Sequence, residues 1–127
     1  MIREHIEIVE SAIEGERVAV PLDGTVFEML HSTTSSVAAE PTRFSYFENA
    51  GVVWGDYAGD TVVEGRFAGV REGDIVRLSY NHRSVSGTLT HGNAVTVVSR
   101  TGDGALRLTE FYGSAAGPET SVCVEVR

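Results

Sequence analysis

The chain has 127 residues, 42% of them hydrophobic and 22% charged, which is typical of one globular domain. Its formal net charge of −8 disfavours nucleic acid and acidic membranes as partners, and no apolar run is long enough to span a bilayer. All ten basic residues are arginine, which excludes lysine Schiff-base chemistry, and the single cysteine, Cys123, excludes an intrachain disulfide. The first residues lack the apolar segment of a signal peptide, so we expect a cytoplasmic protein.

The first 15 residues differ in pattern from the rest of the chain. Four apolar residues recur at helical spacing, and Gly15 follows them as a helix stop: Ile2, Ile6, Val9 and Ile13. We predict a short amphipathic N-terminal helix, with a strand over residues 5–9 as the alternative. Residues 1–24 are then an extension of a domain that occupies residues 25–127.

From residue 17 onward the apolar residues alternate with polar ones, which is typical of β-strands. Turn residues such as Gly, Asp and Asn separate the alternating segments. We predict a mainly β fold, an antiparallel meander of about eight strands closed into a small barrel. The predicted strands span 17–20, 25–32, 42–48, 52–58, 61–70, 74–83, 86–99, 105–112 and 119–126.

Two predicted hairpins give a register for three of these strands. Turns centred near residues 84–85 and 102–103 would place Tyr80 opposite Leu89 and Val97 opposite Leu108. One face of the three strands then collects most of the apolar residues, and we predict that it is the barrel interior. The face comprises Val76, Leu78, Tyr80, His82, Gly87, Leu89, His91, Val95, Val97, Leu106, Leu108, Glu110 and Tyr112.

Ionisable side chains on an otherwise apolar interior face indicate a binding or catalytic site. Glu110, His82 and Tyr80 are the candidate catalytic groups, Glu110 as a base and the other two as hydrogen-bond donors. The structural alternative is a solvated Glu110 at the barrel mouth, with tyrosines as core filler. The candidate ligand-binding residues are Leu78, Leu89, His91, Leu108, Tyr112, Trp54, Tyr57 and Arg66.

The strand at residues 61–70 allows two registers. One puts Val62, Glu64, Arg66 and Ala68 inside and buries a Glu–Arg pair near Tyr80. The other, shifted by one residue, puts Val63, Gly65, Phe67 and Gly69 inside, and we favour it because it buries no charge. Some aromatic residues of the preceding hairpin must also face inward, but the pattern leaves open which ones.

Searches for cofactor and metal motifs find none. No glycine-rich phosphate loop follows a strand, no nucleophile elbow occurs, and the four histidines lack metal-ligand spacing. We therefore expect neither a cofactor nor a metal site.

Several short blocks give the chain a family resemblance from about Phe27 to Val126. They are GVVWGDYAG at 51–59, EGRFAG at 64–69, YNH at 80–82, GTLTHG at 87–92 and DGALRLTEF at 103–111. In order and spacing they resemble a family of small bacterial proteins often labelled N-acetylglutamate synthase. The resemblance implies a calycin-like barrel, similar in architecture to avidins and fatty-acid-binding proteins. Acetyl transfer from coenzyme A is not expected, because the chain has no phosphate cradle or basic patch.

Three functions fit these observations. The first is a barrel that binds a small apolar or aromatic molecule, and the second is a cofactor-independent isomerase, cyclase or lyase that uses Glu110, Tyr80 and His82. The third is a structural or interaction module with a filled barrel. We expect a small organic ligand as partner, and a homo-oligomer is compatible with the sequence.

Overall fold

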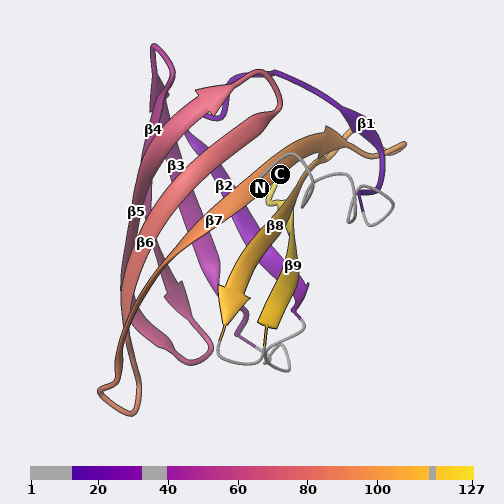
Figure 1. Ribbon diagram of the computed structural model, residues 1–127. Coiled ribbons are helices and arrows are strands. Elements are labelled where there is room, and N and C mark those ends of the chain that lie inside the picture. Colours follow the sequence, from indigo (N-terminus) through magenta and orange to yellow (C-terminus); the bar gives the residue numbers. More distant parts are fainter. Residues whose placement is uncertain (1–12, 33–39, 115–116) are drawn as a thin grey trace.

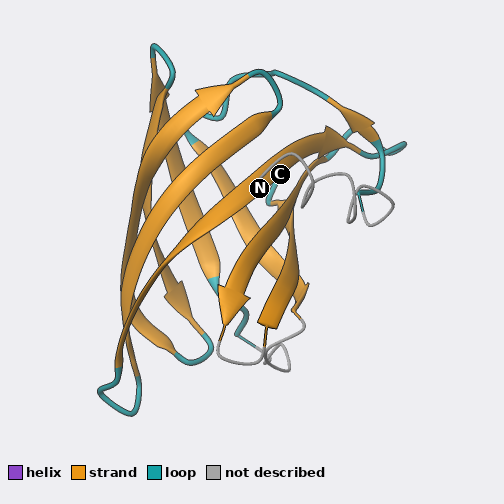
Figure 2. Cartoon of the chain, in the orientation of Figure 1, coloured by secondary structure: helices purple, strands orange, loops and turns teal. Residues whose placement is uncertain are grey.

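The computed structural model describes residues 13–32, 40–114 and 117–127, and within these ranges the chain forms strands and no helix (Figure 2). No helix among these residues could therefore cross a membrane. The strands are β1 (Glu16–Arg17), β2 (Thr25–Ser32), β3 (Arg43–Asn49), β4 (Val52–Gly59), β5 (Val62–Glu72), β6 (Ile75–Ser84), β7 (Leu89–Arg100), β8 (Leu106–Ser114) and β9 (Gly117–Glu125).

Strands β2 to β9 close into an eight-stranded antiparallel barrel (Figure 1). Neighbours along the chain pair from β2 through β9, and the pairing of β9 with β2 completes the circle. Closure removes the exposed edges of the meander, as the alternating pattern predicts.

The predicted N-terminal helix is wrong where the structure can test it. Ile13 to Gly15 are not helical, and Glu16 and Arg17 form β1, which pairs with the end of β7 at Arg100 and Ser99. Residues 1–12, where most of the predicted helix would lie, are outside the described residues. β7 extends past its last pairing with β6 at Val97, and its free edge at Ser99 and Arg100 offers backbone partners to Glu16 and Arg17.

The segment between β1 and β2 closes one end of the barrel, and Figure 1 shows it crossing above the strands. Leu22 is fully buried, and its backbone N–H donates to the Glu48 carboxylate at 2.9 Å. Arg71, which is almost fully buried, donates to the same carboxylate oxygen at 2.7 Å. Val18 and Val20 pack on the core beside this cluster. These contacts cover this end of the barrel with side chains of the described segment.

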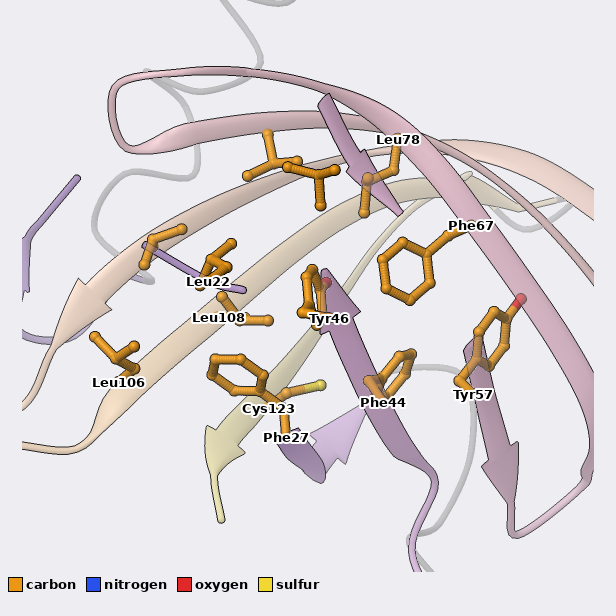
Figure 3. Close-up of a cluster of buried hydrophobic side chains, with 13 residues drawn as sticks. Leu22, Phe27, Phe44, Tyr46, Tyr57, Phe67, Leu78, Leu106, Leu108 and Cys123 are labelled. Carbon is orange, nitrogen blue, oxygen red and sulfur yellow. The ribbon is translucent and has the colours of Figure 1, made fainter. Parts of the chain in front are cut away.

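The core fills the half of the barrel next to this plug. Its side chains come from the inner positions of every strand from β2 to β9 (Figure 3). Phe27, Tyr46, Val53, Leu108 and Cys123 are at most 1% exposed. Burial on this scale is the main favourable term in the folding of the barrel.

The predicted register of β7 is wrong in both of its hairpins. Tyr80 lies opposite Gly92 rather than Leu89, and Leu108 lies opposite Val98 rather than Val97. Both hairpins have three-residue loops that end in a glycine with positive φ, Gly87 at 87° and Gly104 at 89°. A two-residue turn would give the predicted pairing. The extra loop residue shifts the pairing of β7 with β8 by one position, and in the β6–β7 hairpin the loop also lies farther along the chain than predicted, so that pairing shifts by three.

The shift reverses the face of β7 and leaves β6 and β8 as predicted. Both predicted registers are wrong by an odd number of residues, and each odd shift exchanges the inner and outer faces of the next strand. The two exchanges together leave the inner faces of β6 and β8 as predicted. Even-numbered residues of β7, such as Ala94, Thr96 and Val98, are on the same side as Tyr80 and Glu110. Leu89 is 78% exposed, and His91 is exposed as well.

The favoured register of the strand at 61–70 is confirmed for most of its length. Gly65 and Phe67 are buried, whereas Arg66 is exposed and pairs with Glu64 on the outer surface. A bulge between Val62 and Glu64 reverses the alternation at the start of β5, so Val62 packs against the core and Val63 is exposed.

Candidate functional site

A cavity of about 560 Å³ occupies the half of the barrel away from the plug. Its walls come from strands β2 to β9, and its rim lies at the turns that connect β4 to β5 and β6 to β7. Asp60 and Thr61 line the rim at the first turn, and Thr90 lines it next to the second. This volume is within the range of pockets that hold one small organic molecule.

One wall of the cavity is aromatic. The rings of Tyr46 and Phe67 are 4.6 Å apart between centroids, and Phe44 stacks on Tyr57 at 5.1 Å. Tyr57 joins the two pairs, at 6.3 Å from Phe67 (Figure 3). Because β3, β4 and β5 are adjacent, inward aromatic residues on these strands form one continuous surface.

Glycines on neighbouring strands let these rings lie close to the barrel wall. Tyr57 is opposite Gly65, and a Cβ atom there would lie 2.5 Å from its ring. Tyr80 is opposite Gly92, with the corresponding distance 2.6 Å to its hydroxyl. A ring that occupies the space of a missing side chain fills less of the barrel centre, so these pairs help to keep the cavity open.

The wall opposite the aromatic residues carries the buried carboxyl group of Glu110. Glu110 is 9% exposed and lines the cavity. Its Oε1 accepts hydrogen bonds from the Ser121 hydroxyl at 2.9 Å and from the Cys123 thiol at 3.8 Å. Burial raises the pKa of Glu110, and these two hydrogen bonds oppose the rise.

No arginine of residues 13–32, 40–114 and 117–127 lines the cavity, and the described arginines with ion pairs find their partners elsewhere. Arg71 pairs with Glu48 at the plug, Arg77 with Glu72 and Arg43 with Glu28. Glu110 therefore has no ion-pair partner in the described part of the chain. A buried carboxylate without a counter-charge is costly, which accounts for its raised pKa.

Two hydroxyl groups near Glu110 lack a hydrogen-bond partner among the described residues. They belong to Tyr46, which is 1% exposed, and Thr96, which is fully buried and lies opposite Glu110 on β7. Burial, and then the charges of Glu110 and Cys123, raise the pKa of Tyr46 well above its ordinary value. The interior thus offers hydrogen-bonding groups that the protein itself leaves unused.

His82 and Tyr57 form a hydrogen-bonded pair near the rim. Tyr57 Oη and His82 Nδ1 are 2.9 Å apart, and the two rings meet edge to face. Burial lowers the pKa of His82, so its ring is held in the neutral form over a wider pH range than an exposed histidine. Tyr80 stacks on the same imidazole at a centroid distance of 6.4 Å.

The structure brings together most of the residues that the sequence singled out. Seven of them line the cavity, His91 among them as an exposed side chain at the rim: Tyr57, Leu78, Tyr80, His82, His91, Glu110 and Tyr112. Leu108 is fully buried in the core and does not line the cavity.

Three predicted ligand-binding residues lie on the outer surface. Trp54 is 42% exposed and stacks on Phe47, Leu89 is exposed beyond the rim, and Arg66 pairs with Glu64. Each occupies a strand position whose neighbours in the sequence point inward. They cannot contact a molecule inside the barrel without a change of register.

Sequence reasoning missed the inward aromatic residues of β3 and the polar partners of Glu110. Phe44 and Tyr46 line the cavity, while Phe47 in the same strand is exposed. Their even spacing with Thr42 was a signal, but it did not say which face was inside. Ser121 and Cys123 were placed on a strand without a register, so their contact with Glu110 could not be inferred.

No three His, Cys, Asp or Glu side chains within the described ranges are close enough together to hold a metal ion. The groups that the cavity presents are phenols, two imidazoles, two carboxyl groups and several hydroxyls, set among apolar side chains. This arrangement can bind a small molecule by apolar contact and a few hydrogen bonds, and it can also donate or accept a proton.

Comparison with protein families gives one match. A family model described as "Avidin-like protein" matches residues 20–126. This range includes all eight strands of the closed barrel together with Leu22 of the plug. No curated protein and no solved structure matches the chain.

Proposed function

Because the chain belongs to the avidin-like protein family, we propose that it binds one small, largely apolar or aromatic molecule inside its barrel. The observation that carries the proposal is the cavity of about 560 Å³, with an aromatic wall on one side and Glu110 on the other. Flat apolar molecules gain most from contact with aromatic rings, and the few polar groups would fix their orientation. The same cavity argues against a filled barrel that serves only as a structural module.

Filling the cavity tests this proposal directly. Ala94 lines the cavity from β7, opposite Leu78 and Tyr112, so Ala94→Trp would occupy the ligand's space. In a panel of neutral and charged aromatic compounds, we expect some members to raise the melting temperature of the parent protein by mass action, and Ala94→Trp to lose at least about tenfold in affinity for those members.

The matched control is the same replacement on the outer surface. Ala68 is exposed on β5, so Ala68→Trp adds an equal side chain without entering the barrel. Its ligand affinities should equal those of the parent. A panel that stabilises neither protein, or one that stabilises Ala94→Trp and the parent equally, would contradict binding in the cavity.

A cofactor-independent acid–base enzyme is the second candidate, and the buried Glu110 with its raised pKa supports it. Carbonyl compounds that bind in the screen would be incubated with the protein in D₂O. We expect deuterium at the carbon next to the carbonyl, detected by NMR, and a loss of this exchange by about a hundredfold or more in Glu110→Gln. Exchange at the parent rate in Glu110→Gln would remove Glu110 from the mechanism.

A further inference from the structure

Glu110 has polar neighbours on several strands, but none of them is positively charged. Ser121 and Cys123 approach it from β9 and Thr96 from β7, while Tyr46 on β3 lies near enough for the charge of Glu110 to act on its phenol. The charge of Glu110 also reaches Tyr57 and Tyr80, since it contributes to the raised pKa of both. The carboxyl group is thus surrounded by weak donors and aromatic rings.

Hydrogen bonds from described residues reach only one of the two carboxyl oxygens. Both the Ser121 hydroxyl and the Cys123 thiol contact Oε1. Because Glu110 lines the cavity, a bound molecule could supply both a donor and the missing positive charge. An ammonium group does both, and its attraction to a buried carboxylate is stronger than that of a neutral donor.

The rest of the cavity also suits a positive group. The faces of Tyr46, Phe67 and Tyr57 are electron-rich and attract cations that approach within about 6 Å. At the rim, Asp60 adds a negative charge, and the cavity lining contributed by the described residues contains no arginine. The net charge of −8 makes the surroundings of the opening attractive to cations and repulsive to anions.

We propose that the ligand is an organic ammonium compound, a primary or secondary amine on a small apolar or aromatic body, whose nitrogen pairs with the Glu110 carboxylate. This inference rests on the proposed binding function and specifies the chemistry of its ligand. Acids and phosphorylated compounds should be disfavoured, because no cationic side chain of the described residues lines the cavity to receive them.

Binding of such a ligand releases a proton from each Glu110 that is protonated in the free protein. Without a ligand, burial favours the protonated acid of Glu110. The ammonium ion keeps its own protons and stabilises the carboxylate, so the Glu110 proton leaves to the solvent. Tyr46 and Cys123, the other titratable groups beside the carboxyl, stay neutral because burial raises both of their pKa values. His82 lies farther toward the rim, and burial lowers its pKa.

Three probes that differ mainly in charge test the inference: 2-phenylethylamine, 2-phenylethanol and phenylacetate. Titration calorimetry with the intact chain should show the amine bound at least about tenfold tighter than the alcohol. Phenylacetate should show no binding. Titrations of the amine in two buffers of different ionisation enthalpy, between about pH 5 and pH 7, should reveal proton release.

Glu110→Gln keeps the size of the side chain and removes its charge. We expect the amine to lose at least about tenfold in affinity in this variant, the alcohol to bind as before, and proton release to disappear. Glu72→Gln removes a carboxylate from the outer surface, where Glu72 pairs with Arg77, and should leave all three affinities unchanged. Circular dichroism would verify that both variants are folded.

The outcomes separate this inference from the function on which it rests. Equal binding of amine and alcohol by the parent, or an unchanged preference in Glu110→Gln, would overturn the ammonium ligand and leave small-molecule binding intact. If none of the three probes binds while neutral aromatic compounds of the wider panel still bind, the ammonium ligand is likewise overturned and small-molecule binding is left intact. Failure of the whole panel would overturn both proposals.

Discussion

Replacing Gly55 by alanine is expected to lower the free energy of unfolding by about 3 kcal/mol. A Cβ atom at this position would lie 1.9 Å from the backbone oxygen of Ser45 and 2.4 Å from the ring of Phe67. Phe67 is directly opposite Gly55 and is part of the aromatic wall. Since a backbone oxygen cannot rotate away as a side chain can, β3 and β4 would have to separate locally.

Urea denaturation of the parent and the variant would measure this loss. Gly102→Ala is the control, because a Cβ atom at Gly102 meets nothing within 4 Å and its φ is not positive. It should change stability by less than about 0.5 kcal/mol. Equal stability of Gly55→Ala and the parent would show that the strands tolerate a side chain there, and that the close packing of Phe67 on Gly55 is not required.

Replacing Glu110 by glutamine is expected to stabilise the ligand-free protein, increasingly so as the pH rises. Burial raises the pKa of Glu110 in the folded state above its value in the unfolded chain. Between these two values the folded state binds more protons, so the stability of the parent falls as the pH increases through this interval. Glutamine carries no charge, so the variant lacks this loss.

At about pH 8 the gain should be on the order of 1–3 kcal/mol, the cost of a poorly compensated buried polar group. Thermal and urea denaturation at several pH values would measure the difference between variant and parent. The titration of His82 changes the stability of both proteins equally, so it does not affect the difference between them. The exposed Glu72→Gln variant should follow the parent at every pH. Parallel curves for Glu110→Gln and the parent would mean that Glu110 is solvated when the protein is folded.

A stability gain from losing Glu110 would itself bear on function. Groups that reduce the stability of a fold are retained where a binding or catalytic task needs them. Ser121 and Cys123 donate hydrogen bonds to Glu110, and no described cationic side chain lines the cavity around it. Both the ammonium inference and the acid–base candidate would account for its presence.

The alternating pattern of the sequence determined the strands and one inner face. Nearly all the predicted strand limits agree with the structure to within about two or three residues, because alternation and turn residues act locally. The inward positions of Leu78, Tyr80 and His82 on β6 and of Glu110 on β8 were also predicted correctly. The strand limits and the avidin-like family match together describe most of the fold. The inward residues of β6 and β8 make up about half of the candidate site.

The tertiary structure alone decided the pairing and the shape of the interior. Alternation fixes which residues share a face within one strand, whereas the register between strands depends on the length and position of the loops. The loops that end at Gly87 and Gly104 shift the pairing of β7 by an odd number of residues on both sides. That shift moved Leu89 outward. The partners of Glu110 come from distant strands, and the plug depends on Leu22 reaching Glu48 across 26 residues of sequence. Contacts between distant segments form only when the barrel closes, so no local pattern carries them.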